Sequence, residues 1–228
     1  MTVQHHVSDA LLLDYASGSL AEGWSLAVAT HLALNPESRK RLACLEAAAG
    51  ALMDMDEVEQ PDNLDQSWQS MRERLAASSD LLVAKKPVAL PVATKAPSAD
   101  VPVLPEPLRS YLGRDAAQLR WKSLGRGAYH IPIKTNDGET SVRLLRIPAG
   151  KPVPEHSHGG RELTLVLKGS FHDGYARFAR GDLEEADETM QHQPIADVGE
   201  DCICLAVTDA PLRFKSRLLR MVQPFLGI

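Results

Sequence analysis

The sequence is poor in cysteine and in long apolar runs, and each shortage excludes a class of protein. Three cysteines among 228 residues are too few for a disulfide-stapled secreted scaffold. No apolar run approaches the ~20 residues of a membrane span. The first residues also lack the basic region and apolar stretch of a secretory signal. We therefore expect a cytoplasmic protein that makes no contact with a membrane.

Basic charge is scarce in the first part of the chain. Residues 1–80 hold 13 acidic and 5 basic side chains, a net charge of −8, whereas residues 81–228 hold 17 acidic and 20 basic ones, a net charge of +3. Such an acidic surface is poorly suited to phosphate backbones, so we expect no direct binding to nucleic acid. It would attract a basic protein partner, although acidic charge also serves solubility alone.

Glycine is absent between Gly50 and Gly113, and six of the 15 prolines fall between Pro87 and Pro107. The stretch 85–107 also has no aromatic residue, which predicts an extended spacer, partly in the polyproline II conformation, without a helix. We expect this spacer to divide the chain into a helical domain, a linker and a second domain, at residues 1–80, 81–107 and 108–228.

Apolar residues before the linker repeat with helical spacing. Ser8 is a suitable N-cap for a first helix that Gly18 ends, and Asn35-Pro36 predicts a cap followed by a proline in the first turn of a third helix. We expect a small bundle of four helices, at 9–17, 21–34, 36–53 and 64–77. Such a bundle buries little apolar surface, so a metal or a partner would help to stabilise it.

After the linker, the apolar period changes from helical spacing to two. We expect strands at residues 140–147, 162–167 and 202–207, with further candidates at 127–133, 212–214 and 221–225. Many short strands separated by Gly- and Pro-marked turns are typical of a β-sandwich or β-barrel. The sequence thus predicts an α+β protein whose helices precede an all-β domain.

The strongest chemical pattern lies in this second half. His156 and His158 are two apart, so in an extended segment they project to the same face. Glu162 follows a Gly-Gly pair at which the backbone can bend, and His192 comes eleven residues after Gly181. Imidazoles together with a carboxylate form a ligand set for a divalent transition metal.

These residues resemble the cupin family. Its first motif, G(X)5HXH(X)3–4E(X)6G, is matched at every fixed position, by Gly150, His156, His158, Glu162 and Gly169. In its second motif a Gly and a His match at Gly181 and His192, but Asp187-Glu188-Thr189 replaces the usual Pro-x-Gly. The resemblance implies a double-stranded β-helix barrel that holds a metal with His156, His158, Glu162 and His192. We expect zinc, although Mn, Fe, Ni or Cu also fit such a set.

A cupin that follows acidic helices and a Pro-rich spacer resembles the ChrR-type anti-sigma factors. The likeness covers nearly the whole chain and is most telling at residues 5–12, 27–32, 162–167 and 201–206. It implies that the helices sequester an extracytoplasmic-function sigma factor. It also implies that the cupin is needed for release when the cell meets an oxidant such as singlet oxygen. The alternative is a metal-dependent cupin enzyme, such as a dioxygenase, whose helices serve only to form a homo-oligomer.

One departure from that family concerns a second metal site. Zinc-containing anti-sigma domains carry a His followed by His-x3-Cys-x2-Cys, and here His6 and His31 match the two histidines. Asn35 and Ser38 stand in place of the two cysteines. Amide and hydroxyl groups are poor zinc ligands, so we expect this site to be lost or very weak.

Cys202 and Cys204 share one face of a predicted strand. Side chains two residues apart lie ~6–7 Å from each other along a strand, too far for an easy disulfide. Buried cysteines most often act as small apolar residues. We therefore interpret this pair as packing residues, with redox sensing as the alternative.

Overall fold

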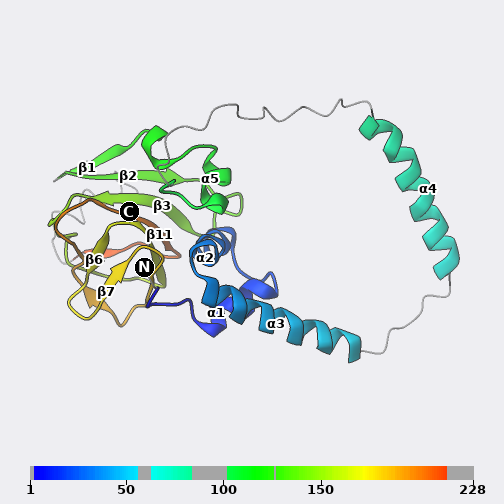
Figure 1. Cartoon of the computed structure of the whole chain (residues 1–228), viewed down its shortest axis with the longest axis horizontal. Helices are drawn as coiled ribbons and strands as arrows, with labels where there is room; N and C mark the ends of the chain where they lie inside the picture. The colour runs from blue at the N-terminus through cyan, green and yellow to red at the C-terminus, as the bar shows by residue number, and fades with distance from the viewer. Residues whose placement is uncertain (1–2, 56–62, 84–101, 126, 215–228) are drawn as a thin grey trace. The chain divides into compact units, whose positions relative to one another are not determined.

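Figure 1 presents a computed structural model of the chain, which describes residues 3–55, 63–83, 102–125 and 127–214. Contacts group the chain into two compact units. One unit comprises Met1–Ala49 with Pro102–Ile228, and the other comprises Gly50–Val101. Within the described ranges, no helix is both long and apolar enough to cross a membrane.

The four expected helices are confirmed, and a short fifth one follows them. They are α1 (Asp9–Ala16), α2 (Glu22–Leu34), α3 (Pro36–Met55), α4 (Leu64–Val83) and α5 (Glu106–Leu112). Ser8 caps α1 by accepting the Leu11 N–H. Asn35 Oδ1 accepts the backbone N–H groups of Glu37 and Ser38, at 3.0 and 3.2 Å, and so starts α3 as the sequence predicts.

The end of the expected linker differs from the prediction. Residues 84–101 lie outside the described ranges, but α5 begins at Glu106, inside the stretch for which no helix was expected. Pro107 is tolerated there because the first turn of a helix does not use its N–H groups. Leu104 is fully buried, and its N–H donates to Asp115 Oδ1 at 2.9 Å. The last residues of the expected spacer therefore belong to the folded unit.

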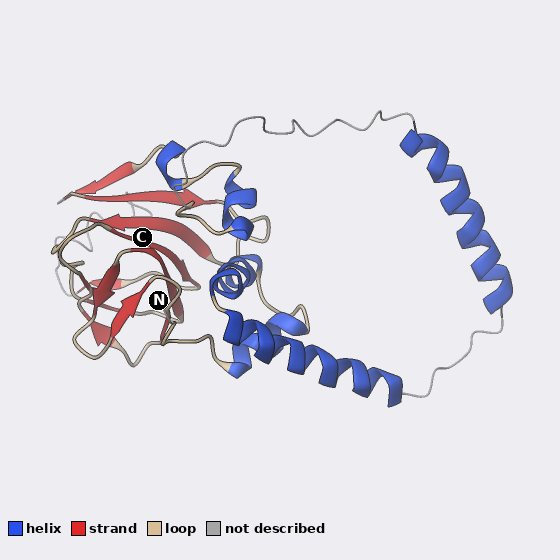
Figure 2. Ribbon diagram, viewed as in Figure 1, coloured by secondary structure: helices blue, strands red, loops and turns tan. Residues whose placement is uncertain are grey.

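The strands after α5 build a barrel from antiparallel ladders (Figure 2). The largest sheet has the order β1-β2-β3-β11-β5-β8, and two three-stranded sheets, β10-β6-β7 and β12-β4-β9, complete the barrel. The bounds are β1 (Lys122–Gly125), β2 (Ala128–Ile133), β3 (Ser141–Ile147), β4 (His156–Ser157), β5 (Glu162–Lys168), β6 (Ser170–His172), β7 (Arg177–Ala179), β8 (Leu183–Ala186), β9 (Gln191–His192), β10 (Ile195–Ala196), β11 (Cys202–Thr208) and β12 (Arg213–Phe214). Five of the six expected strands are confirmed, and residues 221–225 lie outside the described ranges.

The central strands β5 and β11 are buried on both faces, and alternate residues of β3, β5 and β11 belong to two cores. One face contributes Val142, Leu144, Leu163, Leu165, Leu167, Ile203, Leu205 and Val207 to the larger core. The other face contributes Ile147, Val166 and Cys202 to a smaller core inside the barrel. Because both of their faces are covered, β5 and β11 are largely apolar in sequence.

Helix α2 packs directly on the outer face of the large sheet. Leu26, Ala27 and Val28 join the same core as the outward-facing side chains of β3, β5 and β11. The approach is close at Gly23, where an added Cβ would lie 2.5 Å from Val142 Cγ2. The first helices and the barrel therefore share one hydrophobic core. The division at residues 1–80, 81–107 and 108–228 remains a prediction.

Candidate metal centre

The structure brings the three predicted histidine ligands together at one end of the barrel interior. His156 on β4 and His192 on β9 are cross-strand partners, and His158 follows β4 directly. All three are at least 97% buried. His192 Nε2 lies 3.2 Å from both His156 Nε2 and His158 Nε2. A tetrahedral ion with Nε2 ligands at about 2.0–2.1 Å would separate them by about 3.3–3.4 Å, so the spacing fits a metal.

The hydrogen bonds of Nδ1 in His156 and His192 fix the protonation of these two rings and leave Nε2 facing the middle of the cluster. His156 Nδ1 donates to the carbonyl of Pro154 at 2.8 Å, and His192 Nδ1 lies 3.1 Å from Glu184 Oε1. In a neutral imidazole whose Nδ1 carries the proton, Nε2 presents only a lone pair. The Nε2 lone pairs of His156 and His192 therefore point at one another in a buried space, an arrangement that a shared cation stabilises.

Glu162 lies beside this cluster, against the outer nitrogen of His158. Its Oε2 is 3.2 Å from His158 Nδ1, and its Oε1 accepts the hydroxyl of Thr164 at 2.9 Å. Burial alone would raise the pKa of Glu162, but the hydrogen bond from His158 and the nearby imidazoles hold this pKa below its ordinary value. The ionised carboxylate supplies the negative charge that a divalent ion in this place requires.

Two acidic residues behind His192 had no role in the sequence analysis. Glu184, on β8, holds His192 Nδ1, and Asp173 forms a side-chain hydrogen bond with Glu184. Burial raises the pKa of Glu184, whereas its hydrogen bond raises the pKa of His192 against the effect of burial. A carboxylate behind a ligating histidine orients the ring and fixes its tautomer. No strand was expected at residues 183–186, so nothing in the sequence indicated that Glu184 faces the barrel interior.

The turn that leads to His192 forms without the Pro-x-Gly of the cupin motif. The Asp187 side chain accepts the backbone N–H of Thr189 at 2.9 Å and the hydroxyl of Thr189 at 2.6 Å. The carbonyl of Asp187 accepts the N–H of Met190 at 3.1 Å. An aspartate that bonds the backbone two residues on makes a tight turn by itself. This substitution therefore keeps His192 in the cluster.

The second group of expected metal residues forms a hydrogen-bonded cluster. Asn35 Nδ2 donates to His6 Nδ1 at 2.7 Å and to His31 Nε2 at 3.2 Å. The hydroxyl of Ser38 donates to His31 Nε2 at 3.0 Å. Asn35 Oδ1, the one atom of its amide able to bind a metal, is used to cap α3. These residues do not fit a zinc ion, since N–H and O–H donors already occupy the ring acceptors.

Cys202 and Cys204 both face the barrel interior and are buried. Cys202 packs with Ile147, Val166 and Phe171. The hydrogen bond with the Cys202 thiol, together with burial, raises the pKa of Cys204 well above that of a free thiol. Because the thiolate is the reactive form, this environment favours the packing interpretation of the pair.

Residues 180–185, which we call the junction segment, join the candidate metal centre to the N-terminal residues. Asp182 Oδ1 accepts the backbone N–H groups of Gln4 and His5, at 2.6 and 2.9 Å. The Leu183 N–H donates to the carbonyl of His5 at 3.1 Å. Residues 4–8 thereby cover β8, an edge strand of the large sheet.

Glu184 and Glu185 of the junction segment form hydrogen bonds on opposite faces of β8. The N–H of Ser8 donates to Glu185 Oε1 at 2.7 Å, while Glu184 holds His192 inside the barrel. Arg180 donates to the carbonyl of Val103 at 2.8 Å, three residues before the start of α5. Because neighbouring strand residues point to opposite faces, Glu184 faces the barrel interior while Leu183 and Glu185, on either side of it, face residues 4–8.

Comparison with known proteins gives matches at the level of both domain and full chain. Residues 111–211 match the model of the ChrR cupin-like domain. The anti-sigma-E factor ChrR of Cereibacter sphaeroides is 46% identical over 228 residues, all of both chains. The crystal structure of Rhodobacter sphaeroides SigE in complex with the anti-sigma ChrR matches with a TM-score of 0.70 and 42% identity, over 91% of this chain and 99% of that one.

Proposed function

Since this chain belongs to the ChrR family, as a relative 46% identical over its whole length shows, we propose that it is an anti-sigma factor. It sequesters an extracytoplasmic-function sigma factor in the cytoplasm and releases it under oxidative stress of the singlet-oxygen type. The alternative, a metal-dependent enzyme such as a dioxygenase, has less support, because the full-length relative is a regulator.

The structural observation that carries this proposal is an exposed apolar stripe on α4. Leu64, Trp68, Met71 and Leu75 lie on one face of the helix and are 51–56% exposed. An amphipathic helix with unburied anchors at this spacing is the usual form of a helix that docks in a partner's groove. A few buried residues supply most of the energy of such interfaces, and tryptophan is among the commonest of them, so Trp68 is the main candidate anchor.

The charge of residues 1–80 is consistent with the same partner. Their net charge of −8 complements a basic protein surface, of the kind that contacts promoter DNA. We propose that α4 supplies the apolar anchors, while the surrounding acidic residues favour encounter with a basic surface and discourage binding to DNA.

We propose that the cupin part senses the signal through a metal bound by His156, His158, His192 and Glu162. Zinc is the ion we favour for this donor set, and Mn, Fe, Ni or Cu would also fit. The junction segment is the route by which this centre acts on the N-terminal residues. A change at His192 moves Glu184, and the hydrogen bonds of Leu183 and Glu185 to residues 4–8 change with it.

The sigma-binding proposal is tested by placing charge in the apolar stripe of the full-length chain. We expect Trp68→Glu with Met71→Glu to weaken binding of the cognate sigma factor at least 100-fold, as measured by calorimetry or biolayer interferometry. Gln66→Glu with Ser70→Glu is the matched control, because it adds the same charge to the opposite, exposed face of α4. Equal affinities for the two double variants would reject α4 as the docking helix.

A further inference from the structure

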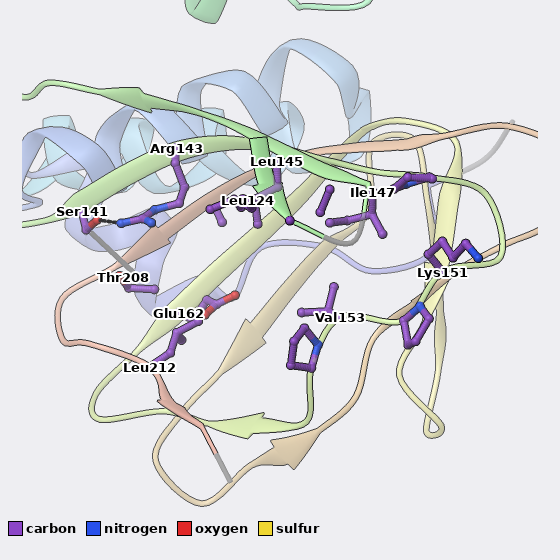
Figure 3. Close-up of a pocket in the computed structure, with 16 residues that line it drawn as sticks. Leu124, Ser141, Arg143, Leu145, Ile147, Lys151, Val153, Glu162, Thr208 and Leu212 are labelled. Carbon is purple, nitrogen blue, oxygen red and sulfur yellow. Dashed lines mark hydrogen bonds between the residues drawn. The ribbon is translucent and has the colours of Figure 1, made fainter. Parts of the chain in front are cut away.

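The apolar side chains of α4 face solvent, unlike those of the barrel. Figure 3 shows the barrel arrangement, in which Leu145, Ile147 and Val153 are directed into an interior cavity. On α4, every side chain that the structure describes, at residues 64–77, is exposed, and the apolar stripe is among them. Most helices in proteins owe their stability to the packing of an apolar face. A helix with this much exposed apolar surface therefore gains stability when another helix covers the stripe.

The spacing of the stripe is that of a coiled-coil seam. Its members, Leu64, Trp68, Met71 and Leu75, follow one another at intervals of four, three and four residues. These intervals alternate between the d and a positions of a heptad. A period of 3.5 residues keeps all four side chains facing one straight partner helix. The stripe is thus matched to a helix and not to a flat sheet.

The charges beside the stripe are complementary to those of a second copy of α4. Asp65 and Arg72 occupy consecutive e positions and are both exposed, so they lie on the same flank of the stripe. In an antiparallel pair, the twofold axis keeps the two copies of this flank on one side. When Trp68 packs against Met71 of the second copy, Asp65 lies beside Arg72 of that copy. Symmetry repeats this ion pair, so each dimer contains it twice.

A parallel pair does not use these charges. In that arrangement each helix residue lies level with its own copy, and Asp65 is about 10 Å along the axis from Arg72 of the second copy. The residue that faces Arg72 across a parallel seam is Ser67, which is neutral. Trp68 would also have to pack against its own copy. The sequence of α4 therefore favours the antiparallel orientation.

From this spacing and charge pattern we propose that the chain forms a homodimer in which α4 packs antiparallel against α4 of a second copy. Only four apolar side chains from each helix meet, so the contact is small and the dimer is weak and reversible. The dimer covers the same stripe that the proposed function assigns to the sigma factor. Dimer and sigma complex therefore exclude each other. This competition rests on the proposed function, whereas the dimer itself does not.

The dimer is tested by sedimentation of the full-length chain over a series of concentrations. We expect the native chain to show an equilibrium of monomer and dimer, with a dissociation constant in the micromolar range. Asp65→Arg and Arg72→Glu each replace two ion pairs with two repulsions, so each should weaken the dimer about ten-fold.

Mixing these two variants is the decisive measurement. One then carries arginine at both e positions and the other carries acids at both, so the mixture regains the ion pairs that neither variant has alone. We expect a heterodimer with a dissociation constant within about three-fold of the native value. This recovery also shows that each variant keeps a folded α4. Glu73→Arg is the matched control, because it reverses an acidic charge on the face opposite the stripe and should leave the dimer unchanged.

The competition is tested separately, by adding the cognate sigma factor to the native dimer. We expect the dimer to be replaced by a complex of one chain with one sigma factor. A chain that dimerises but does not bind the sigma factor would reject the proposed function and leave the dimer intact.

Three results would overturn the inference. The first is that the native chain remains monomeric at millimolar concentration. The second is that a dimer forms but neither charge reversal weakens it, or that the mixed variants do not pair, which would place the contact outside α4 or in another register. The third is that the sigma factor binds without separating the two copies, which would reject a shared surface.

Discussion

The imidazole of His31 on α2 donates from Nδ1 to the carbonyl oxygen of Gly181, 2.9 Å away and 150 positions later in the chain. Burial lowers the pKa of His31 to about 4, so the ring is neutral at pH 7 and has one N–H to give. With that proton at Nδ1, Nε2 accepts the hydroxyl of Ser38. A single neutral ring thus joins α2, the start of α3 and the junction segment.

This neutral ring predicts a pH dependence of stability. In the unfolded chain the His31 pKa is 6.5, and in the folded chain it is about 4. Between these values the unfolded chain binds a proton that the folded chain does not, so the free energy of unfolding rises with pH. The contribution of His31 should be complete above pH 6.5 and should decrease by about 3 kcal/mol as the pH falls to 4.

Urea unfolding of native and His31→Gln chains at pH 4.5 and 7.5 measures this effect. Glutamine does not titrate, and its amide can retain a hydrogen bond to Gly181. The difference in unfolding free energy between the two pH values should therefore be smaller in the variant. An equal pH dependence in the two proteins would show that His31 is protonated in the folded state or is not the group responsible.

The cluster of His6, His31, Asn35 and Ser38 predicts a gain of metal binding on substitution. Its polar atoms lie 2.7–3.2 Å from one another, near the spacing of ligands around one ion. Asn35→Cys with Ser38→Cys would replace two hydrogen-bonding groups with thiolates, which zinc binds strongly. We expect one zinc per native chain, bound in the barrel, and two per chain in the double variant.

Elemental analysis after equilibration with zinc and gel filtration gives these ratios. Ser17→Cys with Ser19→Cys is the matched control, since it adds two thiols near one another at exposed positions. The native chain and the control should give the same ratio. Two tightly held zinc ions in the native chain would mean that Asn35 and Ser38 do not exclude the metal.

Glu184 is predicted to affect both metal affinity and the N-terminal residues. Glu184→Met removes the carboxylate that holds His192 Nδ1, and loss of such a partner typically weakens metal binding 10–100-fold. In the native chain, removing zinc should accelerate hydrogen exchange in residues 4–8, whose amides donate to the junction segment. In the variant, exchange there should no longer depend on zinc.

Competition with a chelating dye measures the affinity, and mass spectrometry measures the exchange. Glu188→Met, in the exposed turn before His192, is the control and should behave as the native chain does. If zinc changes exchange of residues 4–8 equally in the native and Glu184→Met chains, the junction segment is not the route between the two sites. The anti-sigma proposal would be unaffected by that result.

Much of this architecture could be predicted from local patterns. Ser8 and Asn35 cap their helices as expected because capping depends on a few neighbouring residues. The convergence of His156, His158 and His192 could be predicted from spacing together with the cupin resemblance. These predictions succeed where the information is contained in short stretches of sequence.

Contacts between distant segments could not be predicted in the same way. The apolar alternation of β3 shows that the face with Val142 and Leu144 is buried, but not that α2 packs against Val142. Glu184 is separated from His192 by a turn, and the sequence alone does not show that its side chain points into the barrel toward that ring. The position of Glu162 against His158 Nδ1 likewise depends on how the Gly159-Gly160 bend closes in three dimensions.

The last prediction separates sigma binding from signal response. His156→Ala with Glu162→Ala removes one imidazole of the cluster and the carboxylate beside His158, so the barrel should lose its metal. The apolar stripe on α4 contains neither residue, and sigma affinity should therefore change less than three-fold. Singlet oxygen generated by a photosensitiser should no longer release the sigma factor, as measured by loss of the complex on gel filtration.

His172→Ala with Glu188→Ala removes the same two residue types from exposed positions and should respond as the native chain does. If the cluster variant is folded and still releases the sigma factor at the native rate, the metal centre is structural, and sensing must occur elsewhere in the complex.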